Sequence, residues 1–104
     1  MEADKPVARV FRATARPGTK QALLDLFRTV SRDVVKSKEG LLRLAVYEPI
    51  DPDGMVLGFE TVWCSLAHVE AAFGPAWKTP HLPPGYAGMI QSCFVEHYFV
   101  DIEP

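Results

Sequence analysis

Cysteine is scarce in this sequence, and its two cysteines lie far apart. Cys64 and Cys93 form no CxxC pair and no Cys/His spacing of the kind that holds zinc. Two isolated thiols also provide no disulfide framework. His68, His81 and His97 are equally dispersed and form no HExxH-type motif. We therefore expect no metal and no cofactor, and we expect both cysteines to be small buried side chains.

Runs of basic residues and long apolar runs are also missing. Eleven Lys and Arg residues are spread along the chain against thirteen Asp and Glu, which gives a formal net charge of -2. Binding to nucleic acid requires a concentrated basic face, so nucleic acid is not an expected partner. The longest uncharged apolar run, residues 55–59, is too short to span a bilayer, and MEADKPVARV lacks the pattern of a signal peptide. We expect no membrane partner and a cytoplasmic location.

The sequence does contain an alternation of strand-like and helix-like segments. With 104 residues, of which 48% are hydrophobic, we expect one globular domain over residues 1–104. Segments rich in β-branched and aromatic residues predict strands, and apolar residues at three- and four-residue spacing predict helices. The predicted strands are residues 7–15, 41–48, 55–63 and 92–100, and the predicted helices begin after Thr19 and Ser65. This βαββαβ order predicts an α+β, ferredoxin-like fold with a four-stranded antiparallel sheet.

Glycine and proline mark the ends of these elements. Gly40 suits the left-handed conformation that follows a helix, so the first helix is expected to end near Lys36. Gly74-Pro75 interrupts the apolar stripe of the second helix, which is therefore predicted to be short or broken. His68 falls off that stripe and is expected to be solvated. Residues 87–91 predict one further helical turn before the last strand.

The predicted strands are apolar on both faces. In the third strand, Leu57, Phe59 and Trp63 alternate with Val56 and Val62. Two helices cover only one face of a four-stranded sheet, and a face in contact with water shows polar residues. We therefore expect a second copy of the chain to cover the other face, which makes the protein a homodimer.

Four motifs, taken in order, resemble the antibiotic biosynthesis monooxygenase (ABM) family, including its quinol monooxygenase-like members. They are a Pro-Gly before the first helix, a Glu-Gly before the second strand, a Glu-x-x-Trp ending the third strand and a Thr-Pro-His after the second helix. In this sequence they read RPGTKQALLDLF, KEGLLRLAVYE, FETVWCSLAHVEAAF and TPHLPPGY. The resemblance implies a dimeric α+β barrel in which two sheets pack face to face, with a small-molecule pocket between the sheet and the helices of each subunit.

The resemblance also places the segment after the second helix, WKTPHLPPGY, at the mouth of that pocket. Trp77, His81 and Tyr86 would then form its wall and lid, and the prolines would lower the entropy lost in ordering them. For Trp77 the favoured interpretation is instead a core position that continues the helix stripe. His81 has no periodic core position to fill, so it is the candidate catalytic base, with Tyr86 as a hydrogen-bond donor. His97 alternates with apolar residues and is expected to lie in the core or the dimer interface.

Four more residues are candidates for binding the substrate: Arg12, Tyr47, Glu60 and Trp63. Glu60 lies inside a strand, where its carboxylate needs either a partner, Arg9 or Arg12, or a polar cavity. Trp63 matches the tryptophan of the family, but the role favoured for it is to anchor the core. Tyr47 is in a position to reach either the dimer seam or the pocket.

Three functions are compatible with these residues. The resemblance implies a cofactor-independent monooxygenase that oxidises a small electron-rich aromatic, of the quinol or anthrone type, with O2. Some relatives instead bind and degrade haem with an Asn on the first strand, a Trp inside the second helix and a His after it. Here VARVFRATA contains no Asn and EAAF no Trp, so only His81 is in place. The third function is a non-catalytic dimeric barrel that binds a small hydrophobic molecule.

Overall fold

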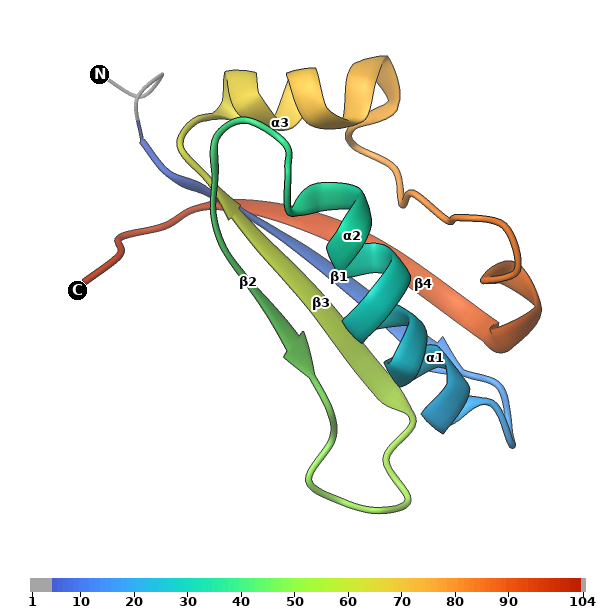
Figure 1. Ribbon diagram of the computed structural model, residues 1–104. Helices are drawn as coiled ribbons and strands as arrows, with labels where there is room; N and C mark the ends of the chain where they lie inside the picture. Colours follow the sequence, from blue (N-terminus) through green and yellow to red (C-terminus); the bar gives the residue numbers. More distant parts are fainter. Residues whose placement is uncertain (1–4, 104) are drawn as a thin grey trace.

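The computed structural model describes residues 5–103 and shows a four-stranded antiparallel sheet with its helices on one face (Figure 1). The elements are β1 (Val7–Ala15), α1 (Lys20–Leu26), a π-helical turn (Phe27–Ser31), α2 (Arg32–Val35), β2 (Leu41–Tyr47), β3 (Val56–Trp63), α3 (Leu66–Phe73), two short 3-10 turns (Gly74–Ala76 and Ala87–Met89) and β4 (Ile90–Phe99). This order confirms the predicted ferredoxin-like βαββαβ fold. No helix within residues 5–103 is both long and apolar enough to cross a membrane.

Strand β1 lies inside the sheet, whose order is β2-β3-β1-β4, so β2 and β4 are its edges. The register pairs Arg9 of β1 with Thr61 of β3 and with His97 of β4. Directly paired residues of neighbouring strands project to the same face of a sheet. Arg9, Thr61 and His97 are therefore on one face, together with the core residue Phe11.

The core lies between this face and the helices. Phe27, at the start of the π-helical turn, packs edge-on against Phe11 with ring centroids 5.9 Å apart. Trp63 is fully buried, packs edge-on against Phe73 of α3 at 5.6 Å, and donates its indole N–H to Thr61 Oγ1 at 2.9 Å. These aromatic contacts hold both helical segments against the sheet, where buried rings of this size are large stabilising contributors.

The two predicted helices are present, with one difference. The first is not α-helical throughout, because it widens to π-helical geometry over Phe27–Ser31 before α2 ends at Val35. π-Helical turns are rare in proteins, and those that occur are often located at functional sites. The second ends at Phe73, is followed by Gly74 with a φ of 74°, and continues only as a 3-10 turn, so the prediction of a short or broken helix is confirmed.

The helix-free face of the sheet carries exposed apolar side chains. Phe94 and Tyr98 of β4 are each 49% exposed, and Val56 of β3 is 53% exposed. They surround a small buried group on the same face, formed by Ala8, Val10 and Val62. The two-sided apolar pattern read from the sequence therefore leaves an uncovered apolar surface on the single chain.

His68 is half-buried, so the prediction that it is solvated is wrong. Its Nδ1 lies 2.7 Å from Ser65 Oγ, which also accepts the His68 backbone N–H at 3.3 Å as the N-cap of α3. The ring packs over Gly40, which precedes β2 and has a φ of 90°. A Cβ built on Gly40 would lie 2.2 Å from His68 Cδ2. Gly40 therefore provides both the turn and the space for this cap.

We predict that Gly40→Ala destabilises the protein by about 3 kcal/mol, because the substitution adds backbone strain and a collision with His68. Gly18→Ala is the matched control: Gly18 has a φ of 81° but nothing within 4 Å of its added Cβ. Gly18→Ala should lower the free energy of unfolding only through backbone strain, by roughly 1–2 kcal/mol. Urea unfolding of both variants measures the difference, and equal costs would contradict the packing role of Gly40.

Candidate functional site

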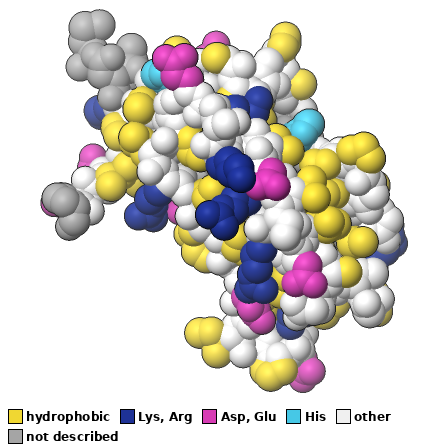
Figure 2. Space-filling model, viewed as in Figure 1, with side chains coloured by type: hydrophobic (Ala, Val, Ile, Leu, Met, Phe, Trp, Pro, Cys, Tyr) yellow, Lys and Arg dark blue, Asp and Glu magenta, His cyan; other side chains and the backbone are white. Residues whose placement is uncertain are grey.

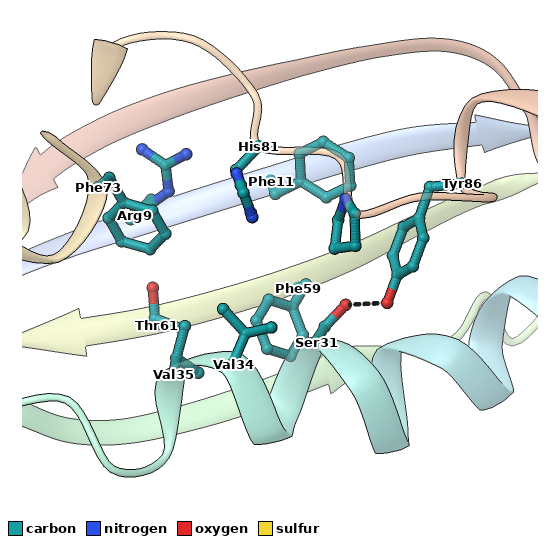
Figure 3. A pocket seen from close by; sticks show the side chains of 11 residues that line it. Arg9, Phe11, Ser31, Val34, Val35, Phe59, Thr61, Phe73, His81 and Tyr86 are labelled. Carbon is teal, nitrogen blue, oxygen red and sulfur yellow. Dashed lines mark hydrogen bonds between the residues drawn. The ribbon is translucent and has the colours of Figure 1, made fainter. Parts of the chain in front are cut away.

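A partly open cavity of about 50 Å³ lies between the helix-facing side of the sheet, α2 and the segment that follows α3. In Figure 3, Arg9 and Phe73 lie at one end of the cavity and Ser31 and Tyr86 at the other. The lining residues are Arg9, Phe11, Ser31, Val34, Val35, Phe59, Thr61, Phe73, His81, Pro83 and Tyr86. A dry apolar cavity that binds benzene has a volume of about 150 Å³. An aromatic ligand therefore requires the roof, residues 77–86, to move outward.

Arg9 is the charged residue at the floor of the cavity and is only 5% exposed. Its Nη1 donates to the carbonyl of Trp77, and its Nη2 donates to the carbonyl of Thr79 at 3.1 Å. The guanidinium carbon lies 3.9 Å from the centre of the Phe73 ring, in a cation–π contact. Arg9 thereby ties the middle of the sheet to the roof.

No carboxylate within residues 5–103 forms a salt bridge with Arg9. Desolvation by burial lowers the pKa of its guanidinium well below its ordinary value, to about 10, so the group remains a cation at neutral pH. A buried charge without an opposite charge is costly, and carbonyl dipoles offset that cost only in part. The cavity therefore favours a ligand that brings a negative charge next to Arg9.

His97 of β4 lies beside this cation. Its Nε2 is 3.0 Å from Arg9 Nη1, and since a guanidinium only donates, Nε2 accepts and the ring proton resides on Nδ1. Desolvation, followed by repulsion from Arg9, lowers the pKa of His97 from 6.5 to about 4. The neutral ring packs edge-on against Trp77 with centroids 4.8 Å apart. His97 thus holds Arg9 in place without adding charge.

The other end of the cavity is formed by two hydroxyls. Tyr86 is 2% exposed, and its hydroxyl lies 2.8 Å from Ser31 Oγ and donates to the carbonyl of Leu26 at 3.2 Å. Ser31 ends the π-helical turn and Leu26 immediately precedes it. Burial raises the pKa of Tyr86 above its ordinary value, so the phenol is neutral at physiological pH. This pair is suited to hydrogen bonding with a ligand oxygen rather than to taking its proton.

His81 contributes to the cavity lining from the roof (Figure 3). His81 is also exposed to solvent, so its imidazole lies between the cavity and bulk water. Pro80 precedes it, and Pro83 and Pro84 follow, which restricts the backbone of this segment. An imidazole at the mouth of an apolar cavity is well placed to take a proton from a ligand and pass it to water.

The predicted site residues fall into three groups. His81 and Tyr86 line the cavity. Trp77 does not line it: its ring packs on His97 beside the core, and its carbonyl accepts from Arg9. Trp63 lies in the core, where its hydrogen bond orients the lining residue Thr61. The remaining three, Arg12, Tyr47 and Glu60, are on the helix-free face.

Glu60 is paired, but not with the predicted Arg9 or Arg12. It accepts from the Tyr47 hydroxyl at 3.0 Å and from Arg43 at 3.4 Å. The register places Val10 opposite Glu60, so Arg9 projects to the other face of the sheet. The Arg12 guanidinium instead lies 6.0 Å from the centre of the Tyr47 ring. Arg9 was a wrong prediction because successive side chains of β1 project to opposite faces of the sheet. Arg12 shares the face of Glu60 but lies against the Tyr47 ring, and Glu60 is bound by Tyr47 and Arg43 of β2.

Sequence reasoning missed the residues that give the cavity its polarity. Arg9, Ser31 and Thr61 were not among the candidates for the pocket. A signal for Arg9 was present, because it occupies the same alternating positions as Val7 and Phe11, which are core positions. A charged residue in a core-facing register has to meet either a partner or a ligand.

Comparison with known proteins adds the family. The sequence model of the family "Antibiotic biosynthesis monooxygenase" matches residues 6–76, more than half of the chain. The chain belongs to this family. The matched range contains Arg9, Ser31 and Thr61, whereas the roof with His81 and Tyr86 lies beyond it. Among curated proteins, no sequence matches the chain.

Solved structures show the same fold at low sequence identity. Protein SO0527 from Shewanella oneidensis superposes with a TM-score of 0.72 at 15% identity, covering 91% of this chain and 90% of that one. SnoaB from Streptomyces nogalater, a cofactor-independent oxygenase in a mutant form, gives 0.70 at 16% identity, covering 95% and 96%. A dabb family protein from Mesorhizobium loti, described with a ferredoxin-like fold, gives 0.67 at 10% identity, covering 95% and 99%.

We predict that His97→Gln reduces the loss of stability on acidification. With a pKa of about 4 in the folded protein against an ordinary 6.5, His97 takes up its proton more readily in the unfolded chain. The stabilisation of the folded state by neutral His97 is complete above pH 6.5, falls as the pH drops towards 4, and is absent below pH 4. Gln keeps an acceptor for Arg9 but does not titrate. The free energy of unfolding, measured by urea at several pH values, should therefore fall less between these limits than in the unmodified protein, and parallel curves would contradict the assignment.

Proposed function

We propose that the protein is a cofactor-independent monooxygenase that oxidises a small quinol- or anthrone-type aromatic with O2. The observation that carries the proposal is Arg9, a buried cation that has no carboxylate partner among residues 5–103 and lies at the end of a cavity lined by Phe11, Phe59 and Phe73. Family membership supports the reaction class, and the fold shared with SnoaB, a cofactor-independent oxygenase, is consistent with it.

The first step in this chemistry is removal of a proton from the substrate. His81 accepts the proton at the mouth of the cavity, and Arg9 stabilises the resulting oxyanion. The hydroxyl oxygens of Ser31 and Tyr86 accept a hydrogen bond from a substrate hydroxyl at the opposite end of the ring, because their own protons are donated within the protein. An aromatic with oxygen substituents at two ends therefore matches the polarity of the cavity, while the phenylalanines contact its faces.

The substrate anion then supplies the electrons for dioxygen. It transfers one electron to O2, and the resulting superoxide and substrate radical combine to form a carbon-bound peroxide. The remaining hydrogen on that carbon leaves as a proton while the O–O bond breaks, which leaves one oxygen atom on the substrate as the quinone carbonyl. The other oxygen departs as hydroxide and becomes water with a proton returned by His81. The apolar lining of the cavity protects the anion and radical from solvent.

We predict that His81→Ala lowers turnover of a hydroquinone panel under oxygen by at least tenfold, since general-base catalysis contributes roughly 100-fold to 10,000-fold. His68→Ala is the matched control, because His68 packs on Gly40 outside the cavity. Oxygen consumption and quinone absorbance measure the rates. Equal small effects from both variants would remove His81 from catalysis and favour a non-catalytic binding protein.

We also propose that the protein acts as a homodimer joined through the helix-free face of its sheet. Phe94, Tyr98 and Val56 are exposed there around a buried group, and apolar surface of this kind is covered in stable proteins. Glu60, Arg43 and Tyr47 form a hydrogen-bonded network on the same face, so its polar groups are already satisfied before a partner arrives.

For this dimer we predict a mass of twice 11.6 kDa in light scattering at micromolar concentration. Phe94→Glu should shift the protein towards the monomer, since it places a charge in the apolar face. Val30→Glu, at a 39% exposed position on the helical side, is the control and should leave the mass unchanged. A monomeric unmodified protein would contradict this arrangement.

A further inference from the structure

Thr61 of β3 lies directly opposite Arg9 of β1 and lines the same cavity. Residues paired in this way project to one face of the sheet, with their Cβ atoms roughly 4.5–5.5 Å apart. Thr61 is only 2% exposed, so its hydroxyl is shielded from bulk water. In Figure 3 this hydroxyl points towards the end of the cavity where Arg9 and Phe73 lie. A buried hydroxyl in this position requires hydrogen-bond partners.

The indole of Trp63 determines which hydrogen bond the Thr61 hydroxyl can still make. Trp63 is two residues further along β3, on the same face, and its N–H lies 2.9 Å from Thr61 Oγ1. Because an indole nitrogen only donates, Thr61 Oγ1 accepts in this bond and retains its own proton. That proton has no acceptor among residues 5–103. Thr61 therefore presents an unused donor to the cavity, and a buried donor without an acceptor is costly.

Arg9 contributes further unused donors at the same end. A guanidinium has five N–H groups. Within residues 5–103 at most three of them are used, by the carbonyls of Trp77 and Thr79 and by His97 Nε2. All three bonds come from Nη1 and Nη2, so the Nε–H and one N–H of Nη2 have no acceptor there. Together with the Thr61 hydroxyl, three donors next to one positive charge are available to a ligand.

The lining of the cavity supplies no negatively charged acceptor for these donors. None of the lining residues is an Asp or a Glu. The hydroxyl oxygens of Ser31 and Tyr86 are acceptors, but they lie at the opposite end (Figure 3). Figure 2 shows hydrophobic side chains gathered over the segment that forms the roof, with the acidic side chains of that view lying away from it. An anionic partner for Arg9 and Thr61 therefore has to come from the ligand.

We infer that Thr61 is a ligand-binding residue that donates its hydroxyl proton to the anionic oxygen of the ligand beside Arg9. The inference rests on the proposed function, in which this anion is the deprotonated substrate. Trp63 is the positioning residue, because its N–H occupies the hydroxyl oxygen and leaves only the proton for the ligand. One end of the cavity then donates and the other accepts. The ligand class is therefore an aromatic with an anionic oxygen at the Arg9 end and a hydroxyl at the end formed by Ser31 and Tyr86.

Binding of two small aromatics tests the inference without turnover. 4-Hydroxybenzoate carries an anionic group and a hydroxyl at opposite ends of one ring, and 4-methylphenol replaces the anionic group with a methyl group. Thr61→Val keeps the shape of the side chain but removes the donor. It should raise the Kd of 4-hydroxybenzoate at least tenfold at neutral pH, because hydrogen bonds to charged groups are strong. The Kd of 4-methylphenol should change by less than about twofold. Calorimetry measures both, and Thr61→Ser, which keeps the hydroxyl, should restore the affinity for the anion.

A second measurement uses the unmodified protein, so it does not depend on whether Thr61→Val folds. When Thr61 donates to an anion, its oxygen becomes a stronger acceptor for the Trp63 N–H. The indole proton signal of Trp63 should therefore move downfield in 1H–15N NMR when 4-hydroxybenzoate binds, and move less with 4-methylphenol. The chain has two tryptophans, so Trp77→Phe assigns the two indole signals.

The outcomes are distinct. Unchanged affinity for 4-hydroxybenzoate in Thr61→Val, with its fold verified by circular dichroism, overturns the inference. Equal losses for both ligands, an unmoved Trp63 signal or no binding of 4-hydroxybenzoate to the unmodified protein overturn it as well. Hydroquinone turnover is measured separately. If the anion binds as predicted but no hydroquinone is oxidised, the proposed function is wrong and the role of Thr61 stands. If hydroquinone is oxidised while Thr61→Val leaves anion binding unchanged, the role of Thr61 is wrong and the function stands.

Discussion

The hydrogen bonds of Arg9 join the middle of the sheet to the roof of the cavity, and the rest of the site depends on them. One guanidinium binds the carbonyls of Trp77 and Thr79, stacks on Phe73 and determines which nitrogen of His97 is protonated. It therefore positions the roof segment that brings His81 over the cavity. Because the same group carries the charge of the cavity, the position of the roof and the proposed ligand class both depend on one buried cation.

The alternation of β1 separates two roles. Its helix-facing residues, such as Arg9 and Phe11, form the cavity, whereas Val10 and Arg12 belong to the opposite, exposed face. A change of register by one residue would exchange these sets. The apolar contacts of the helix-facing core maintain that register, so chemistry and proposed assembly use different faces of one strand. A substitution on one face can then alter oligomeric state without touching the cavity.

Much of the fold could be predicted from local pattern. Residues 7–15 form β1 with the bounds expected from their composition, and the interruption at Gly74-Pro75 ended α3 as expected. The site was harder to predict from the sequence, because strand register and the path of the loop, rather than spacing in the sequence, bring its residues together. The position of His81 after Thr79-Pro80 predicted correctly that it lines the cavity. The partner of Glu60 could not be predicted in the same way, because it depends on which side chains of the neighbouring strand β2 lie on the helix-free face. The π-helical turn that carries Ser31 had no recognisable signature in the sequence.

The claim that the cavity is an anion site is tested most directly by the ionisation of a bound phenol. A chromophoric phenol such as 4-nitrophenol changes its absorbance on losing its proton, so its pKa can be followed while it is bound and compared with that in buffer. Beside the uncompensated charge of Arg9, the bound phenol should ionise at a lower pH than the free phenol, and Arg9→Met, with the fold verified by circular dichroism, should remove most of this shift. An unchanged or raised pKa in the unmodified protein, or the same lowered value in Arg9→Met, would contradict the account.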